Sequence, residues 1–249
     1  MSGSPELAIV IPAYDEVDRI PQAIERSATV LAALAFDWEI IVVADGGPAA
    51  LRQAAEAAAA RIGRTRVLVN DPNRGKGYTV RRGVLASSAA IVGFLDADLA
   101  QPPEALPAFV DAIRRGADLA IGTRVASDDP APSAVRRLSS ALFAGATRLA
   151  LDLPFQDLQC GMKVFAGRIA HPLFEAQRLE RFAFDAELLA IAVRWGLRVA
   201  EVPVTVEPQT TSTVRVLRDG PRMLADVVRV RRRLRRLPPP PADVRRAVS

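Results

Sequence analysis

Short apolar runs alternate with helical patterns along the first half of the chain, and this alternation restricts the fold more than any other feature. The runs occupy residues 7–12, 38–43, 65–69, 90–95 and 119–122, and helical patterns lie between them at 20–34, 48–62, 77–87 and 103–114. Continuously apolar runs are typical of strands buried on both faces, and strand–helix repetition is typical of parallel sheets. The sequence therefore predicts a single α/β domain with a Rossmann-like, mainly parallel sheet flanked by helices. Ligands are expected at the carboxyl ends of the strands.

The regular alternation of apolar runs and helical patterns ends after Arg124. We predict an amphipathic helix at 135–151, a helix at 185–195 and a strand at 198–206, and we expect an acceptor region to be built from this part. The catalytic domain is placed at 7–220, after a disordered N-terminus at 1–6. A basic amphipathic helix follows at 221–237, and four prolines end it before a disordered tail at 238–249.

Composition and charge limit where the protein works. A single cysteine, Cys160, excludes an internal disulfide or a thiolate cluster for zinc and is typical of a reducing compartment. No signal peptide and no apolar window of about 18 residues are found, so we expect neither export nor a membrane-spanning helix. From Arg215 onward, eleven arginines and three aspartates give this tail a strongly positive charge, whereas the whole chain carries +5. We predict a cytoplasmic protein peripherally associated with an anionic membrane surface.

Asp96 and Asp98 end the fourth apolar run. Two carboxylates at a strand end suit a hard divalent ion such as Mg²⁺ or Mn²⁺, which shares its oxygen ligands with substrate phosphates. Such an ion would neutralise charge on a departing nucleoside diphosphate. The alternative is that Asp98 caps the next helix and Asp96 is a solvated turn residue.

Four ordered segments resemble glycosyltransferase family 2 enzymes with a GT-A fold. They are 9–16 (IVIPAYDE), 39–47 (EIIVVADGG), 73–77 (NRGKG) and 96–104 (DADLAQPPE). Further on, 122–124 (GTR), 157–165 (DLQCGMKVF) and 181–189 (RFAFDAELL) resemble the polyprenyl-phosphate branch, most closely the dolichyl-phosphate β-glucosyltransferases. The resemblance covers roughly 7–230. It implies a metal-dependent, inverting hexosyltransferase that uses a nucleotide sugar and a polyprenyl phosphate.

The resemblance implies that Pro12, Tyr14, Glu16 and Asp45 line the nucleoside pocket. One departure is Ala44, because family members usually carry two acidic residues before the glycine at this point. The identity or affinity of the donor is therefore open. Glu16 and Asp45 could also be ordinary loop or cap residues.

Lys76 stands in a glycine-flanked loop, where backbone N–H groups and one ammonium could approach phosphate oxygens. The loop is not a P-loop, because Asn70 replaces the first glycine and Gly77 stands where Ser or Thr is needed. No G-x-G-x-x-G motif opens the first helix, which argues against a nicotinamide enzyme. A plain surface loop is the alternative.

We predict that Arg124 and Arg137 bind the acceptor phosphate. Arg136 is the alternative to Arg137. A guanidinium fork matches phosphate geometry and stays charged, and the family places paired arginines near this point. Either arginine could instead be a solvated helix charge.

The remaining candidates come from the resemblance. Gln159, with Asp157, belongs to the sugar- and acceptor-contacting segment, and Asp185 takes the place of a catalytic carboxylate, with Glu187 beside it. Since a phosphate acceptor is already anionic, Asp185 could orient groups instead of abstracting a proton. Arg215, after Ser212, would close over the diphosphate. His171 and Cys160 are expected to have packing roles.

The function predicted is transfer of a hexose, with UDP-glucose as donor, to a polyprenyl phosphate with inversion. GDP-mannose is the alternative donor. Other readings are a nucleotidyltransferase, which would release pyrophosphate, a catalytically inactive scaffold, and a nucleic-acid-binding module. The last is opposed by the mildly acidic body and by only two Trp and two Tyr in the chain.

Overall fold

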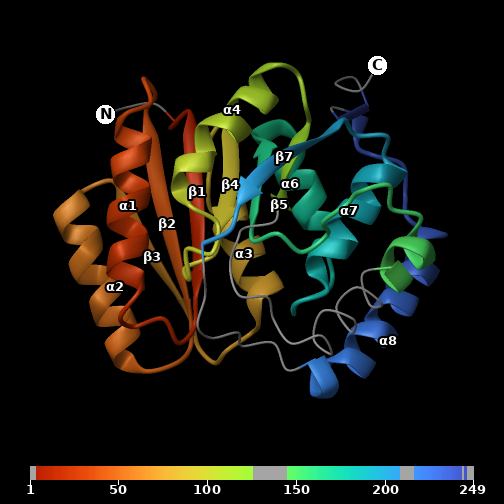
Figure 1. Cartoon of the computed structure of the whole chain (residues 1–249), viewed down its shortest axis with the longest axis horizontal. Coiled ribbons are helices and arrows are strands. Elements are labelled where there is room, and N and C mark those ends of the chain that lie inside the picture. The colour runs from red at the N-terminus through yellow and green to blue at the C-terminus, as the bar shows by residue number, and fades with distance from the viewer. Residues whose placement is uncertain (1–3, 126–144, 208–215, 243, 246–249) are drawn as a thin grey trace.

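The computed structural model describes residues 4–125, 145–207, 216–242 and 244–245, and side chains from 216 to 224 are left undescribed. One seven-stranded sheet forms its centre, in the order β3-β2-β1-β4-β6-β5-β7 (Figure 1). All neighbouring strands are parallel except β6, which runs antiparallel to β4 and β5. The prediction of a mainly parallel α/β sheet is confirmed.

The strands form where continuously apolar runs can be buried on both faces. Their bounds are β1 Leu7–Ala13, β2 Trp38–Asp45, β3 Thr65–Asn70, β4 Ile91–Leu95, β5 Leu119–Val125, β6 Met162–Ala166 and β7 Val199–Thr205. Every residue of β1 is buried. Burying one aliphatic side chain contributes about 1.5–3 kcal/mol, so this central strand is a main source of stability. By contrast, β7 alternates between buried and exposed residues, as expected for an edge strand.

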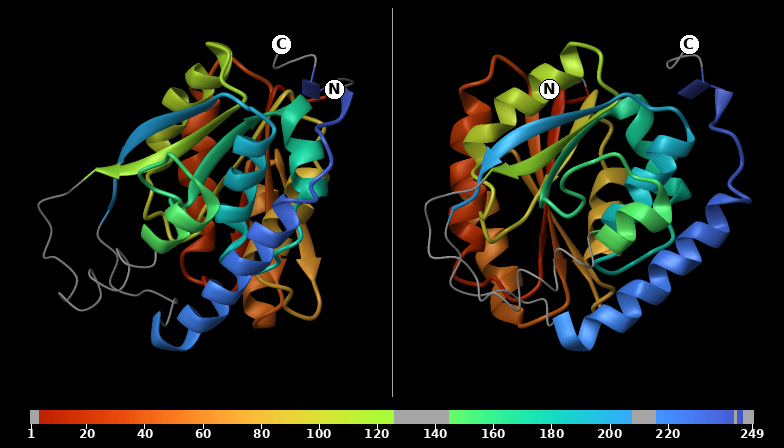
Figure 2. Two further views of the ribbon diagram at one scale, coloured as in Figure 1. Left: turned by 90° about the vertical axis from the view of Figure 1, so that its right-hand side faces the viewer. Right: turned by 45° about the vertical axis from the view of Figure 1, so that its right-hand side comes forward.

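Helices cover both faces of the sheet. Their bounds are α1 Ile20–Ala32, α2 Ala49–Ile62, α3 Lys76–Leu85, η1 Pro103–Ala105, α4 Leu106–Arg114, α6 Gly167–Ala176, α7 Phe184–Arg194 and α8 Val216–Leu234. Contacts group α1, α2 and α4 on one face and α3, α6 and α7 on the other, with α8 packed outside α7 (Figure 2). Helix α3 approaches the sheet closely at Gly83, where a Cβ would lie 2.3 Å from Val10 Cγ1.

Several expected boundaries differ from the structure. The helix predicted at 103–114 is a 3-10 turn followed by α4, which starts at Leu106 with Pro107 in its first turn. Helix α6 was not predicted, because Gly167 opens it and Pro172 interrupts its pattern. Of the helix predicted at 135–151, only 145–151 is described, and it is helical.

Some residues of the segments predicted at 1–6 and 238–249 are described, and they make contacts with the rest of the chain. Near the N-terminus, the Glu6 N–H donates to the Asp37 carbonyl. In the tail, the Trp195 indole N–H donates to the Pro238 carbonyl at 3.2 Å, and Val244 is 1% exposed. Val244 belongs to the hydrophobic core, so this part of the tail lies against the body of the protein.

Candidate active site

Most of the residues predicted to hold the donor lie at one edge of the sheet. Tyr14 follows β1, Asp45 ends β2, and Asp96 follows β4, and these three strands are parallel neighbours. Lys76 begins α3, the helix after β3. Because parallel strands end at the same edge, segments distant in sequence converge there.

Asp45 organises the loop that leads to Lys76. Its buried carboxylate accepts hydrogen bonds from Asn70 Nδ2 at 2.7 Å, from the Arg74 N–H at 2.9 Å and from the Gly75 N–H at 2.7 Å. Asn73 Nδ2 donates to the Asp45 carbonyl at 2.9 Å. Both carboxylate oxygens are therefore engaged in shaping the loop, and a direct contact of Asp45 with the nucleoside stays a prediction.

The turn after Asp45 requires glycine. Gly46 and Gly47 have φ angles of 71° and 82°, a region that L side chains rarely adopt. A Cβ on Gly47 would also lie 2.3 Å from the Tyr14 carbonyl oxygen. These glycines let the loops after β1 and β2 meet closely at the edge of the sheet.

Lys76 and Asp96 form an ion pair in the middle of this edge. The Lys76 ammonium lies 2.7 Å from each Asp96 carboxylate oxygen, but only Oδ2 accepts a regular hydrogen bond. The other oxygen, Oδ1, is buried and has no hydrogen-bond partner. Burial lowers the pKa of Lys76, but the charges of Asp96, Asp185 and Asp98 outweigh it and the net direction is upward. Lys76 is thus held as a cation.

Asp98 stands beside this pair at the turn after β4. Its Oδ1 accepts the Ala100 N–H at 2.9 Å. Burial, and then the negative charge of Asp96, raise the pKa of Asp98 above its ordinary value. A nearby cation would relieve both effects, because it favours the ionised carboxylates.

The residues present fit a divalent cation. Among the described residues, neither the buried Asp96 Oδ1, whose contact is the ion pair with Lys76, nor the buried Oε1 of Gln101 accepts a regular hydrogen bond. A Cβ on Gly161 would lie 2.1 Å from Asp96 Oδ2 and 2.6 Å from Gln101 Oε1, so glycine alone fits beside them. Within the described residues, no group of three or more His, Cys, Asp or Glu could hold a metal. Substrate phosphates would have to complete the coordination of an ion held by Asp96 and Asp98.

Asp185 lies beneath the edge and not on it. The carboxylate is 3% exposed and accepts a 2.6 Å hydrogen bond from the fully buried Lys163, which also donates to the Cys160 carbonyl at 2.9 Å. Burial is the main cause that raises the pKa of Asp185. The carboxylate is thus occupied by Lys163, and its role toward an acceptor stays a prediction.

Arg124, near the end of β5, forms an ion pair with Asp157. Its guanidinium donates through two nitrogens to the two carboxylate oxygens, with Nη2 at 3.0 Å from Oδ1. The Gln159 N–H donates to the same Oδ1 at 3.0 Å, and the Gln159 side chain is exposed. Burial raises the pKa of Asp157, but the hydrogen bond and charge of Arg124, the Gln159 N–H and the charge of Lys163 together outweigh it, and the net direction is downward. The predicted partner Arg137 and its alternative Arg136 lie outside the described residues, as do Ser212 and Arg215, which was predicted to close over the diphosphate.

The residues predicted to line the nucleoside pocket differ in exposure. Tyr14 is 51% exposed, whereas Pro12 is a buried residue of β1 opposite Val43. Glu16 Oε2 accepts the N–H groups of Tyr14 at 2.7 Å and of Asp15 at 3.0 Å, so it shapes the loop after β1. Their contact with a base or ribose stays a prediction.

Two other predictions concern packing. His171 Nε2 lies 2.7 Å from the Ser87 carbonyl oxygen, in agreement with a packing role. Cys160 is fully buried, and burial raises the pKa of its thiol, so it stays protonated and unreactive.

Sequence reasoning missed the residues that support the site. Lys163 was not singled out, although a lysine inside the apolar strand β6 was a signal. Buried lysines are rare unless they are paired, so a buried acid was to be expected. Asn70 and Asn73, which hold Asp45, carry no signal in the sequence.

Comparisons with known proteins agree with this arrangement. The sequence model of Glycosyl transferase family 2 matches residues 8–172. Glycosyltransferase AglD of Haloferax volcanii is 31% identical over 218 residues, which are 86% of this chain and 35% of that protein. Dolichyl-phosphate beta-glucosyltransferase of Drosophila melanogaster is 32% identical over 219 residues, 82% of this chain and 67% of that protein. The chain thus spans about a third of the first relative and about two thirds of the second.

Solved structures show the same fold. Glucosyl-3-phosphoglycerate synthase from Mycobacterium tuberculosis in complex with Mn²⁺ and UDP-glucose matches with a TM-score of 0.69 at 21% identity, covering 91% of this chain and 79% of that one. Its complex with Mg²⁺ and UDP matches with a TM-score of 0.67 at 19% identity, covering 94% and 80%. This likeness confirms the predicted GT-A fold.

Proposed function

The chain belongs to glycosyltransferase family 2, and from this premise we propose that it transfers a hexose from a nucleoside-diphosphate sugar to a polyprenyl phosphate, with inversion at the anomeric carbon. The preferred donor is UDP-glucose. Its relatives include dolichyl-phosphate beta-glucosyltransferases and an undecaprenyl-phosphate 4-deoxy-4-formamido-L-arabinose transferase, whose names specify a lipid phosphate. These names support a lipid-phosphate acceptor for this chain.

The observation that carries the proposal is the meeting of Lys76, Asp96 and Asp98 at the carboxyl edge of the sheet. Lys76 is held as a cation 2.7 Å from Asp96, and Asp98 is next to them in the same turn. Asp96 and Asp98 would hold Mg²⁺ or Mn²⁺, and the ion would supply charge neutralisation for the leaving diphosphate. The Lys76 ammonium, at the N-terminus of α3, is placed to approach the same phosphates.

The acceptor side needs little proton chemistry. A phosphate monoester presents an anionic oxygen at neutral pH, so attack on the anomeric carbon requires no general base. This agrees with Asp185, which is buried and paired with Lys163. Arg124, whose side chain is 50% exposed, could turn part of its guanidinium from Asp157 toward the incoming phosphate. Arg137 is proposed as its partner from the sequence alone.

Helix α8 supports contact with a membrane surface. Val227 and Val230 are buried against the body, whereas Arg229, Arg231, Arg232, Arg235 and Arg236 are exposed. Exposed arginines near an anionic bilayer contribute about 1 kcal/mol each. In the part of the chain that the structure describes, no helix is both long and apolar enough to cross a membrane. We propose peripheral attachment through the outer face of α8.

A donor and acceptor screen tests the function. UDP-glucose and GDP-mannose are each incubated with the protein, Mn²⁺ or Mg²⁺ and a short polyprenyl phosphate, and the released nucleoside diphosphate and the glycolipid are measured. We expect turnover with UDP-glucose that depends on both the lipid phosphate and the metal. Turnover with GDP-mannose but not with UDP-glucose would identify GDP-mannose as the donor. Release of pyrophosphate would contradict a glycosyltransferase.

A further inference from the structure

We infer that Arg233 of α8 is a positioning residue for the donor-phosphate end of α3, acting through Glu187 and the segment 177–180. This inference rests on the proposed function, because it assigns the Lys76 end of α3 to the donor phosphates. Arg233 contacts Glu187, Glu187 contacts the segment 177–180, and this segment contacts the first turn of α3.

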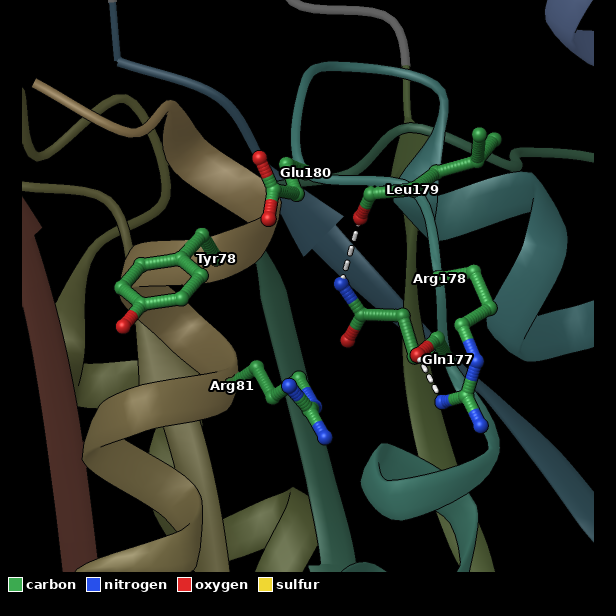
Figure 3. Close-up of a pocket in the computed structure, with 6 residues that line it drawn as sticks. All are labelled: Tyr78, Arg81, Gln177, Arg178, Leu179 and Glu180. Atoms are coloured by element: carbon green, nitrogen blue, oxygen red, sulfur yellow. Dashed lines mark hydrogen bonds between the residues drawn. The ribbon is translucent and has the colours of Figure 1, made fainter.

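The segment 177–180 packs on the first turn of α3. The Glu180 carbonyl accepts the Tyr78 N–H at 3.1 Å, and Gln177 Nε2 donates to the Gly77 carbonyl at 3.0 Å. Figure 3 shows the segment 177–180 across a small cavity from Tyr78 and Arg81 of α3. A Cβ on Gly75 would lie 2.7 Å from the Glu180 carbonyl oxygen, and one on Gly77 would lie 2.6 Å from the Leu179 carbonyl oxygen. A shift of the segment would therefore move the backbone on both sides of Lys76.

Glu187 holds this segment in place from the opposite side. Its Oε2 accepts the Arg178 N–H at 2.9 Å and the Leu179 N–H at 2.7 Å. The residue is 2% exposed and belongs to the first turn of α7. A buried carboxylate that accepts two backbone N–H groups fixes the segment, but it needs a cation to offset the cost of its own burial.

Arg233 supplies that cation from α8. One guanidinium nitrogen donates to Glu187 Oε1, and another donates to the Ala176 carbonyl at the end of α6. In the described part of the chain, the structure gives Glu187 no other ion pair. The neighbours Arg232 and Arg235 are exposed, so Arg233 differs from them in pointing toward the body.

These contacts form one connected path from α8 to the diphosphate site. It runs from Arg233 to Glu187, through the backbone of 178–180 to Gly77 and Tyr78, and so to Lys76 and Asp96. A contiguous hydrogen-bond network of this kind can couple two sites energetically. The coupling is measured as the change in affinity at one end when a residue at the other end is replaced. The prediction is that Arg233 controls donor affinity more than the rate of the chemical step.

Calorimetry with UDP and Mn²⁺ tests this, together with steady-state kinetics on the full chain. Arg233→Met removes the guanidinium and keeps an unbranched side chain, and Arg194→Met, at an exposed arginine that ends α7, is the matched control for charge. We expect Arg233→Met to raise the Kd for UDP and the KM for the donor about tenfold, with kcat changed less than about twofold. Arg194→Met is expected to stay within about twofold of the wild-type protein in all three.

A double variant separates positioning from loss of structure. In Arg233→Met/Glu187→Gln, the amide oxygen can still accept the two N–H groups while no buried charge remains. We expect the double variant to recover most of the lost affinity. Arg233→Lys, which can pair with Glu187 but not also reach the Ala176 carbonyl, is expected to fall in between, and it carries the comparison if Arg233→Met does not fold.

The outcomes distinguish the two proposals. If the wild-type protein binds no nucleoside diphosphate, the proposed function fails. If the wild-type protein binds UDP and a folded Arg233→Met or Arg233→Lys binds it with unchanged Kd, the function stands and the role of Arg233 is refuted. A double variant as impaired as the single one would also overturn the path through Glu187.

Discussion

Asp98 is the residue at which charge and burial oppose each other most directly. Burial, and then the negative charge of Asp96, raise the pKa of its carboxyl group, whereas the Ala100 N–H and the charge of Lys76 lower it. Such a group is stable as an anion when a cation is close, and Lys76 supplies only part of that charge. An additional positive ion beside Asp96 and Asp98 would therefore favour the ionised carboxylate.

Asp98→Asn tests this directly. The amide keeps the shape and can still accept the Ala100 N–H, but it lowers the affinity for a hard cation. We expect turnover to fall by about a hundredfold or more with little change in the free energy of unfolding. Release of nucleoside diphosphate is measured across a Mn²⁺ titration. Asp111→Asn, on the exposed face of α4, is the control, and full turnover of Asp98→Asn would remove the metal from the mechanism.

Lys163 is expected to contribute strongly to the free energy of unfolding. Lys163→Met would leave Asp185 buried without its cation, which costs about 3–5 kcal/mol for a buried pair. The free energy of unfolding is measured by urea denaturation. The double variant Lys163→Met/Asp185→Leu is expected to recover most of the loss, because neither buried charge remains. A single variant as stable as wild type would show that the pair is dispensable.

At the scale of elements, continuous apolar runs made β1 to β5 predictable, because a strand buried on both faces needs them. The direction of β6 was not predictable, since it depends on pairing with β4 and β5 and not on local pattern. Helix α6 was missed because Gly167 and Pro172 oppose helix propensity, and tertiary packing of its apolar face overrides them.

The candidate active site, like the fold, could be predicted from the sequence only in part. Its edge could be predicted, because the motif residues follow strands that end together. What could not be predicted is which partners occupy each side chain. The Asp45 carboxylate accepts hydrogen bonds from the loop before Lys76, and Asp185 is paired with Lys163, 22 residues earlier in the chain. Both pairings arise only from the folded arrangement.

The outer face of α8 gives a prediction for a whole element. Arg231→Gln/Arg232→Gln removes two exposed charges of α8, so we expect vesicle affinity to fall about thirtyfold at about 1 kcal/mol per charge. Sedimentation with vesicles containing anionic lipid measures this, and neutral vesicles give the baseline. The control is Arg115→Gln/Arg194→Gln, which removes two exposed arginines that follow α4 and end α7. Equal sedimentation of both double variants would contradict attachment through α8.

At the scale of the whole molecule, ligand binding should be linked to stability. A ligand that binds only the folded chain stabilises it by about 2.7 kcal/mol at a hundred times its Kd. For a chain of this size, that predicts an increase in Tm of about 5–10 °C with UDP and Mn²⁺ together. Differential scanning fluorimetry measures it, with UDP plus a chelator as the control. An increase that persists in the chelator would mean that UDP binds without the ion.

The reversed strand β6 has a consequence for how such a protein can diversify. Because β6 runs against its neighbours, the residues just before it, Cys160 and Gly161, emerge where β4 ends, and the Asp96 N–H donates to the Gly161 carbonyl at 3.1 Å. The part of the chain after Arg124 thus reaches the carboxyl edge of the sheet directly, beside Asp96. Substitutions just before β6 would therefore change the surroundings of Asp96 without altering the apolar runs that form β1 to β5.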